Sequence, residues 1–281
     1  MNQQKTKLPT SRIFGMYRQW ALISFIISTA AASLTFTLAY NAQTGYISST
    51  AVRIILTVTA FCELLISAIV ARSAPIYINE ENCSALARVT TLILHIAVIF
   101  CGVMAAAGCK GVPFSIDSVK KLDANALFPS YILASILAAS SILIFLSSPA
   151  LRKVKENYSI TSQINGYSTV LFCIFGIAIL YFNTSVEMNN PQKLYLQFAL
   201  ASICLAKLYE MKSRIQEKGN RLFFFFKLSS ISIAPIAAIS TFIAFAEKGK
   251  NFPSAYLYLA IAVGAYALAH VIEIVFSPKQ A

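Results

Sequence analysis

The chain has 281 residues, of which 57% are hydrophobic and only 12% are charged, against about 25% charged residues in an ordinary soluble domain. This composition excludes a soluble globular protein and predicts an integral membrane protein. The net charge of +12 does not indicate nucleic-acid binding, because the basic residues flank apolar segments and do not form one face of a soluble domain.

Eight apolar segments follow one another along the chain, each about as long as the 17 to 25 residues that a helix needs to cross a bilayer. None shows the alternating pattern of a barrel strand, so the predicted fold is all-α with about eight transmembrane helices. The segments are 19–41, 50–72, 88–108, 128–149, 167–185, 194–211, 222–246 and 254–277. The sixth is short and contains Gln197, Lys207 and Glu210; if it lay on the membrane surface, every later loop would change sides.

The eight segments are predicted to form one bundle over 19–277, between a tail at 1–18 and another at 278–281. The fourth and eighth segments both start near Phe-Pro-Ser and end near Ser-Pro, which hints at a parallel repeat of two halves, 1–150 and 160–281. The alternative is that proline and serine are common at helix ends in general.

Basic residues set the predicted orientation. With the N-terminus in the cytoplasm, sixteen of the 23 Lys and Arg residues fall on the cytoplasmic side, so both termini are predicted to be cytoplasmic. The densest cluster, in KLYEMKSRIQEKGNRLFFFFK, is expected to contact anionic lipid headgroups, the partner that its charge suits. Its members are Lys212, Arg214, Lys218, Arg221 and Lys227.

The second segment holds Glu63 within TVTAFCELLISAIVARS, an otherwise nearly apolar run. A charged side chain at mid-bilayer costs about 2.5–3.5 kcal/mol, so it normally faces the bundle interior and is often functional. Burial disfavours the charged form, and a buried Glu without a cation therefore tends to stay protonated. The alternative is a structural one, in which a neutral Glu63 hydrogen-bonds a Ser or Thr of the next helix.

Other polar groups are predicted at a similar depth, in the cytoplasmic half of the membrane. Pro235 cannot donate a hydrogen bond to the carbonyl of residue 231, and it is expected to bend its helix beside neighbouring serines. With Glu63, these residues form the predicted ligand, ion or proton site: His95, Ser230, Ser232, Pro235, His270 and Glu273. Each of these residues also has a structural explanation, as a packed, hydrogen-bonded or solvated side chain.

No catalytic motif is present: the chain has only two His residues, on different segments, and no G-x-S-x-G elbow or P-loop. The six cysteines are scattered without a C-x-x-C pair, so no metal site and no cofactor are expected. Two functions are favoured: a transporter or permease with a proton- or cation-sensitive site, and a non-catalytic membrane subunit or scaffold of a larger complex. An intramembrane enzyme is the third possibility, and a bacterial cytoplasmic membrane is the expected location.

Overall fold

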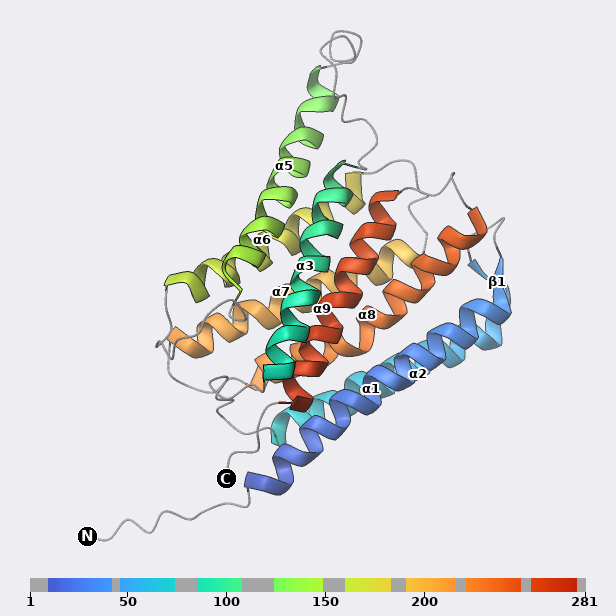
Figure 1. Ribbon diagram of the computed structural model, residues 1–281. Helices are drawn as coiled ribbons and strands as arrows, with labels where there is room; N and C mark the ends of the chain where they lie inside the picture. Colours follow the sequence, from blue (N-terminus) through green and yellow to red (C-terminus); the bar gives the residue numbers. More distant parts are fainter. Residues whose placement is uncertain are drawn as a thin grey trace, which may run out of the picture.

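The computed structural model describes residues 10–41, 46–73, 85–107, 124–148, 160–182, 191–215, 221–248 and 254–276. They form eight helices, one for each predicted segment, and the all-α fold is confirmed (Figure 1). The helices are α1 (Thr10–Ala39), α2 (Thr50–Ser73), α3 (Ala85–Ala107), α5 (Ala124–Leu146), α6 (Ile160–Phe182), α7 (Pro191–Ile215), α8 (Arg221–Lys248) and α9 (Ser254–Phe276). Two short strands, β1 (Tyr40–Asn41) and β2 (Tyr46–Ile47), pair antiparallel between α1 and α2.

Six of the described helices are long and apolar enough to cross a membrane: α1, α2, α6, α7, α8 and α9. They include α7, whose candidate span Gln192–Ser213 covers the sixth predicted segment, 194–211. In α3 and α5 the described apolar stretches are shorter, Leu92–Ala106 and Ile132–Leu146. By helix length and composition the chain is therefore an integral, multi-pass membrane protein.

Most helices begin before their apolar segments, and two begin well before them. α1 starts at Thr10 instead of residue 19, and α6 starts at Ile160 instead of residue 167. Hydropathy marks the part of a helix that lies in hydrocarbon, whereas its hydrogen-bonded turns can continue into the polar headgroup region. The predicted tails at 1–18 and 278–281 are otherwise outside the described residues.

Six helices form a closed ring in which each packs against the next, in the order α3, α5, α6, α7, α8, α9 and back to α3. α7 also contacts α9 across the ring. The hairpin of α1 and α2 lies outside the ring along α8, with α1 also touching α9, and Figure 1 shows this pair along one side of the bundle. α8 is thus the ring helix that packs against both α1 and α2.

One buried cluster shows which helix ends lie together. It joins Tyr17 near the start of α1, Val70 near the end of α2, Phe224 near the start of α8 and Ile274 near the end of α9. A second cluster joins Phe36 of α1, Leu56 of α2 and Ile236 of α8 toward the other end. The first turns of α1 and the last turns of α9 therefore share one end of the bundle (Figure 1).

Candidate functional site

Glu63 lies on the face of α2 that packs against α1 and α8. Leu56, Glu63, Ser67 and Val70 are all buried, and their spacing places them on one side of the helix. The Glu63 side chain is only 3% exposed, whereas α2 presents Phe61, Leu65 and Ile66 outward. The carboxyl group is therefore directed into the protein and not toward lipid.

Three serines from two other helices surround the Glu63 carboxyl group. The Ser28 hydroxyl donates to Oε2 at 2.5 Å, and the Ser24 hydroxyl donates to the same oxygen at 3.5 Å. Ser24 and Ser232 share a further hydrogen bond of 2.5 Å between their Oγ atoms. We call Glu63, Ser24, Ser28 and Ser232 the carboxyl–serine site; it joins α2, α1 and α8.

A further polar contact lies next to the carboxyl–serine site, toward the end of the bundle where α1 starts. Trp20 Nε1 donates to Ser67 Oγ at 2.9 Å, and Ser67 is fully buried one turn beyond Glu63 on α2. Trp20, Ser24 and Ser28 follow one another at four-residue spacing, so they line a single face of α1. Polar groups thus extend for two turns along the contact between α1 and α2.

The carboxyl group lacks the partners that an ionised side chain needs. Its Oε1 atom is buried and has no hydrogen-bond partner, and none of the ion pairs among the described residues includes Glu63. A carboxylate offers about four acceptor positions, and a buried charge is costly unless it is paired. The site is therefore arranged around a group that still has one binding position to fill.

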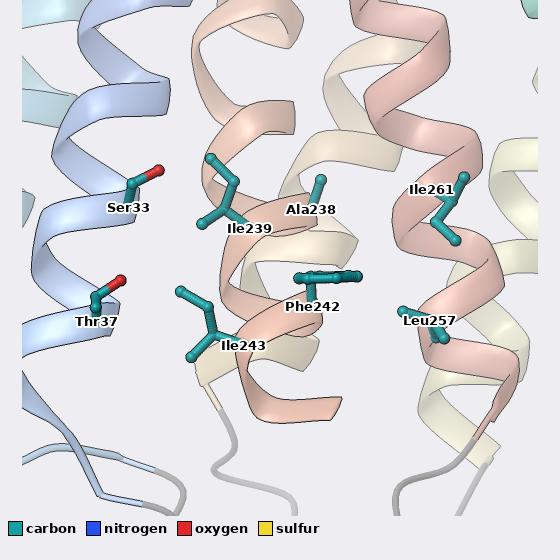
Figure 2. Close-up of a pocket in the computed structure, with 8 residues that line it drawn as sticks. All are labelled: Ser33, Thr37, Ala238, Ile239, Phe242, Ile243, Leu257 and Ile261. Carbon is teal, nitrogen blue, oxygen red and sulfur yellow. The ribbon is translucent and has the colours of Figure 1, made fainter. Parts of the chain in front are cut away.

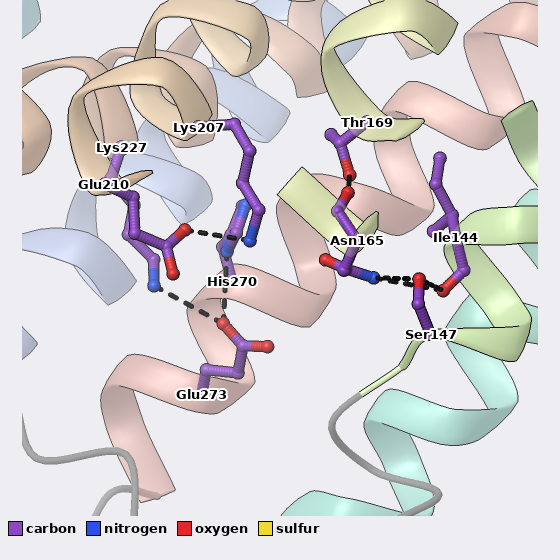
Figure 3. Close-up of polar contacts among 9 residues, drawn as sticks. All are labelled: Ile144, Ser147, Asn165, Thr169, Lys207, Glu210, Lys227, His270 and Glu273. Atoms are coloured by element: carbon purple, nitrogen blue, oxygen red, sulfur yellow. Dashed lines mark hydrogen bonds and ion pairs between the residues drawn. The ribbon is translucent and has the colours of Figure 1, made fainter. Parts of the chain in front are cut away.

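A second set of polar and charged side chains lies between α7, α8 and α9 (Figure 3). Lys227 Nζ of α8 lies 3.4 Å from Glu273 Oε2 of α9, and His270 Nδ1 lies 3.2 Å from the same oxygen. Lys207 Nζ of α7 pairs with Glu210 at 2.9 Å. These five residues are the charged cluster, and the Glu273 side chain, 32% exposed, is its most accessible member.

His95 belongs with the charged cluster and not with Glu63. Its Nδ1 atom shares a 2.7 Å hydrogen bond with Ser148 Oγ at the end of α5, and it is 7% exposed. α3, which carries His95, packs along α9, the helix that carries His270 and Glu273. Asn165 of α6 ties the same end of α5, donating to the Ile144 carbonyl at 3.1 Å and to Ser147 Oγ at 3.3 Å (Figure 3).

The residues predicted to form one site thus fall into two groups. Ser232 lies with Glu63, whereas His270 and Glu273 belong to the charged cluster. The Ser230 hydroxyl donates to the Lys227 carbonyl of its own helix at 2.8 Å. α8 is helical on both sides of Pro235, and this one helix carries Lys227 toward the charged cluster and Ser232 toward Glu63.

Two features of the sites were not anticipated from the sequence. Ser24 and Ser28 were missed, although their four-residue spacing after Trp20 in an apolar helix was the available signal. Lys227, predicted to contact headgroups, is buried and faces Glu273. Of the other predicted headgroup contacts, Lys212 and Arg221 are exposed, while Lys218 and the Arg214 side chain lie outside the described residues.

A groove of about 410 Å³ lies between α1, α8 and α9 (Figure 2). Its lining is apolar except for two hydroxyl groups of α1. The lining residues are Ser33, Thr37, Ala238, Ile239, Phe242, Ile243, Leu257 and Ile261. None of them belongs to the carboxyl–serine site or to the charged cluster, so the groove is a separate feature.

Within the described ranges, no three His, Cys, Asp or Glu side chains converge as a metal site would require. Comparison of the chain with protein-family models, with curated proteins and with solved structures finds no match.

Proposed function

We propose that this multi-pass membrane protein is a carrier of the transporter or permease type, in which the carboxyl–serine site binds a proton or a cation. One observation carries the proposal: Glu63, 3% exposed, lies where three helices meet, with an oxygen that has no partner. An ionisable group inside a membrane bundle is costly to bury and often marks an ion or substrate pathway.

The proposed threading has eight spans, with both termini in the cytoplasm of a bacterial cell. It is supported by the excess of basic residues on that side and by the shared location of the first turns of α1 and the last turns of α9. In this orientation the charged cluster lies toward the cytoplasm. Exposed Lys212 and Arg221 are then placed to contact anionic headgroups.

The alternative function is a non-catalytic subunit that docks another membrane protein through small-residue faces. The chain uses most of these faces internally. Ala134 and Ala138 pack in the ring core, and a Cβ atom added to Gly264 would lie 3.2 Å from Ala238 of α8. Within the described part of the chain, Ser135 and Ala139 of α5 are the small-residue pair that remains exposed at that spacing, and the internal use of the other faces supports the carrier.

The first test is the thermal stability of the purified protein and of Glu63→Gln, measured across pH and with Na⁺, K⁺ or divalent cations. If the folded state holds a proton at Glu63 that the unfolded state releases, raising the pH lowers the Tm of the wild type more than that of Glu63→Gln. If the site holds a cation, that cation raises the Tm of the wild type alone. Glu210→Gln is the matched control, because Glu210 already pairs with Lys207.

A second measurement tests transport directly. Vesicles that contain the protein and a pH-sensitive dye are given a proton or cation gradient, and the decay of that gradient is followed. We expect faster decay with the wild type than with Glu63→Gln or with empty vesicles. Equal decay in all three, together with equal Tm profiles, would assign Glu63 to helix packing and favour the subunit function.

A further inference from the structure

We infer that the ligand of the carboxyl–serine site is a proton, and not sodium, potassium or a divalent metal ion. The inference rests on the proposed function, which makes Glu63 the binding group, and it specifies what that group binds. Its evidence is the arrangement of oxygens around the carboxyl group and the lack of an ion pair with Glu63 among the described residues.

The oxygens of the site already bond to one another. Ser28 Oγ lies 2.5 Å from Glu63 Oε2, and Ser24 Oγ lies 2.5 Å from Ser232 Oγ. Ser232 Oγ is also within 3.2 Å of the Leu228 carbonyl of its own helix. These are distances between oxygens that share a hydrogen, and they leave no ion-sized gap between the paired atoms.

A metal ion would require more ligands than the site offers. Calcium takes about six to eight oxygens at 2.3–2.6 Å, and magnesium requires near-octahedral geometry and keeps several waters. The carboxyl–serine site supplies a single carboxyl group and three hydroxyls, two of which are bonded to each other. A monovalent cation would meet the same paired oxygens.

Among the described residues, no ion pair stabilises an ionised Glu63. α1 directs Trp20, Ser24 and Ser28 toward α2, and α8 contributes Ser232. The nearest charged residue of α8 in the described chain, Lys227, faces Glu273 instead. A proton removes the charge at the carboxyl group and turns its two oxygens into one hydroxyl and one carbonyl, which cost less to bury.

The same hydroxyls provide for proton exchange. When the proton leaves, Ser24 and Ser28 both donate to the carboxylate, so the ionised form keeps two hydrogen bonds. Either hydroxyl of the Ser24–Ser232 pair can be the donor, and the direction of that bond can reverse as Glu63 changes its protonation. α8 therefore senses the state of Glu63 through Ser232.

Infrared spectroscopy of the full chain in lipid bilayers tests this inference. The difference spectrum between the wild type and Glu63→Gln should contain the carbonyl band of a neutral carboxylic acid at neutral pH. We expect equal band intensity in choline, Na⁺, K⁺, Mg²⁺ and Ca²⁺ chlorides, and loss of the band as the pH is raised. Glu273→Gln is the control and should leave the band unchanged, because Glu273 is paired with Lys227.

Two results would overturn the inference: no neutral-acid band from Glu63, or a band that a metal cation removes at constant pH. If Glu63→Gln does not fold, the difference spectrum is taken against Ser28→Ala instead. Loss of the Ser28 hydrogen bond shifts the carbonyl band of a neutral Glu63. If Glu63 is ionised, it has no such band, and the variant changes nothing in that region of the spectrum. The spectrum requires no transport. A neutral-acid band without gradient decay would overturn the proposed carrier function and leave the inference of a proton at Glu63 standing. Gradient decay with a cation-sensitive band would overturn the inference and leave the carrier function standing.

Discussion

At the scale of single residues, Lys227 shows how strongly a buried charge depends on its partner. Its side chain is 7% exposed, and its ammonium group lies 3.4 Å from the Glu273 carboxylate. Glu273→Gln would leave that ammonium with a weaker acceptor, and we expect a loss of about 1–3 kcal/mol of unfolding free energy. The expected loss is below that of a fully buried pair because the Glu273 side chain is 32% exposed. Denaturation in mixed micelles measures it.

Two further variants isolate the effect of the pair. In Lys227→Met with Glu273→Gln the buried charge is gone as well, so we expect part of the lost stability to return. Lys212→Gln changes an exposed lysine and should stay within about 0.5 kcal/mol of the wild type. Equal stability of Glu273→Gln and wild type would show that Lys227 reaches water or headgroups when Glu273 is neutral.

The sequence identified single residues unequally well. Glu63 was recognisable because a carboxyl group in an apolar membrane helix normally faces the interior of the bundle. Ser24 and Ser28 were not, because a helical hydroxyl can bond a carbonyl of its own helix, as Thr29, Thr57 and Ser240 do. Which serine reaches across to a neighbour depends on how the helices pack, and the sequence alone does not state it.

At the scale of helices, Gly102 marks a close approach between α3 and α5. A Cβ atom added there would lie 2.5 Å from Ser141 Cβ and 3.1 Å from Phe172. Gly102→Ala must therefore separate the two helices, and we expect a loss of about 1–3 kcal/mol. Adding Ser141→Gly removes the opposing Cβ atom and should restore much of the stability.

Gly166 is the matched control for this prediction. A Cβ atom added to Gly166 also meets a neighbour at 2.5 Å, but that neighbour is the flexible thioether of Met211. Methionine adapts to such a change, so Gly166→Ala should cost less than Gly102→Ala. Equal losses in both variants would show that helix propensity or the unfolded state decides the effect, and not the approach of α3 to α5.

The existence of all eight helices was predictable, because each needs an apolar run of sufficient length. Their ends were less so, since α1 and α6 extend into polar sequence. Their neighbours were not predictable: α3 packs along α9, and the hairpin of α1 and α2 stays outside the ring. In that arrangement the hydrogen-bond partners of Glu63 come from α1, whereas the charged cluster joins α7, α8 and α9; sequence depth alone had placed the two groups in one site.

At the scale of the whole molecule, the threading of α7 decides the side of every later loop. α7 is the most polar of the six candidate spans, yet it packs between α6 and α8 as a member of the ring. A helix that packs on both neighbours within the bundle is expected to cross the membrane with them. In the proposed orientation its C-terminal end, followed by Lys218 and Arg221, lies in the cytoplasm, as the positive-inside rule favours.

Reporter fusions on either side of α7 test this threading. Alkaline phosphatase, which is active only outside the cytoplasm, should be active when fused after residue 187 and inactive when fused after residue 218 or at residue 281. A fluorescent protein that matures in the cytoplasm should give the opposite pattern and serves as the control for expression. Activity of phosphatase at residues 187 and 218 alike would mean that α7 does not cross. The charged cluster of α7, α8 and α9 would then face the outside, and the proposed cytoplasmic location of that cluster would be wrong.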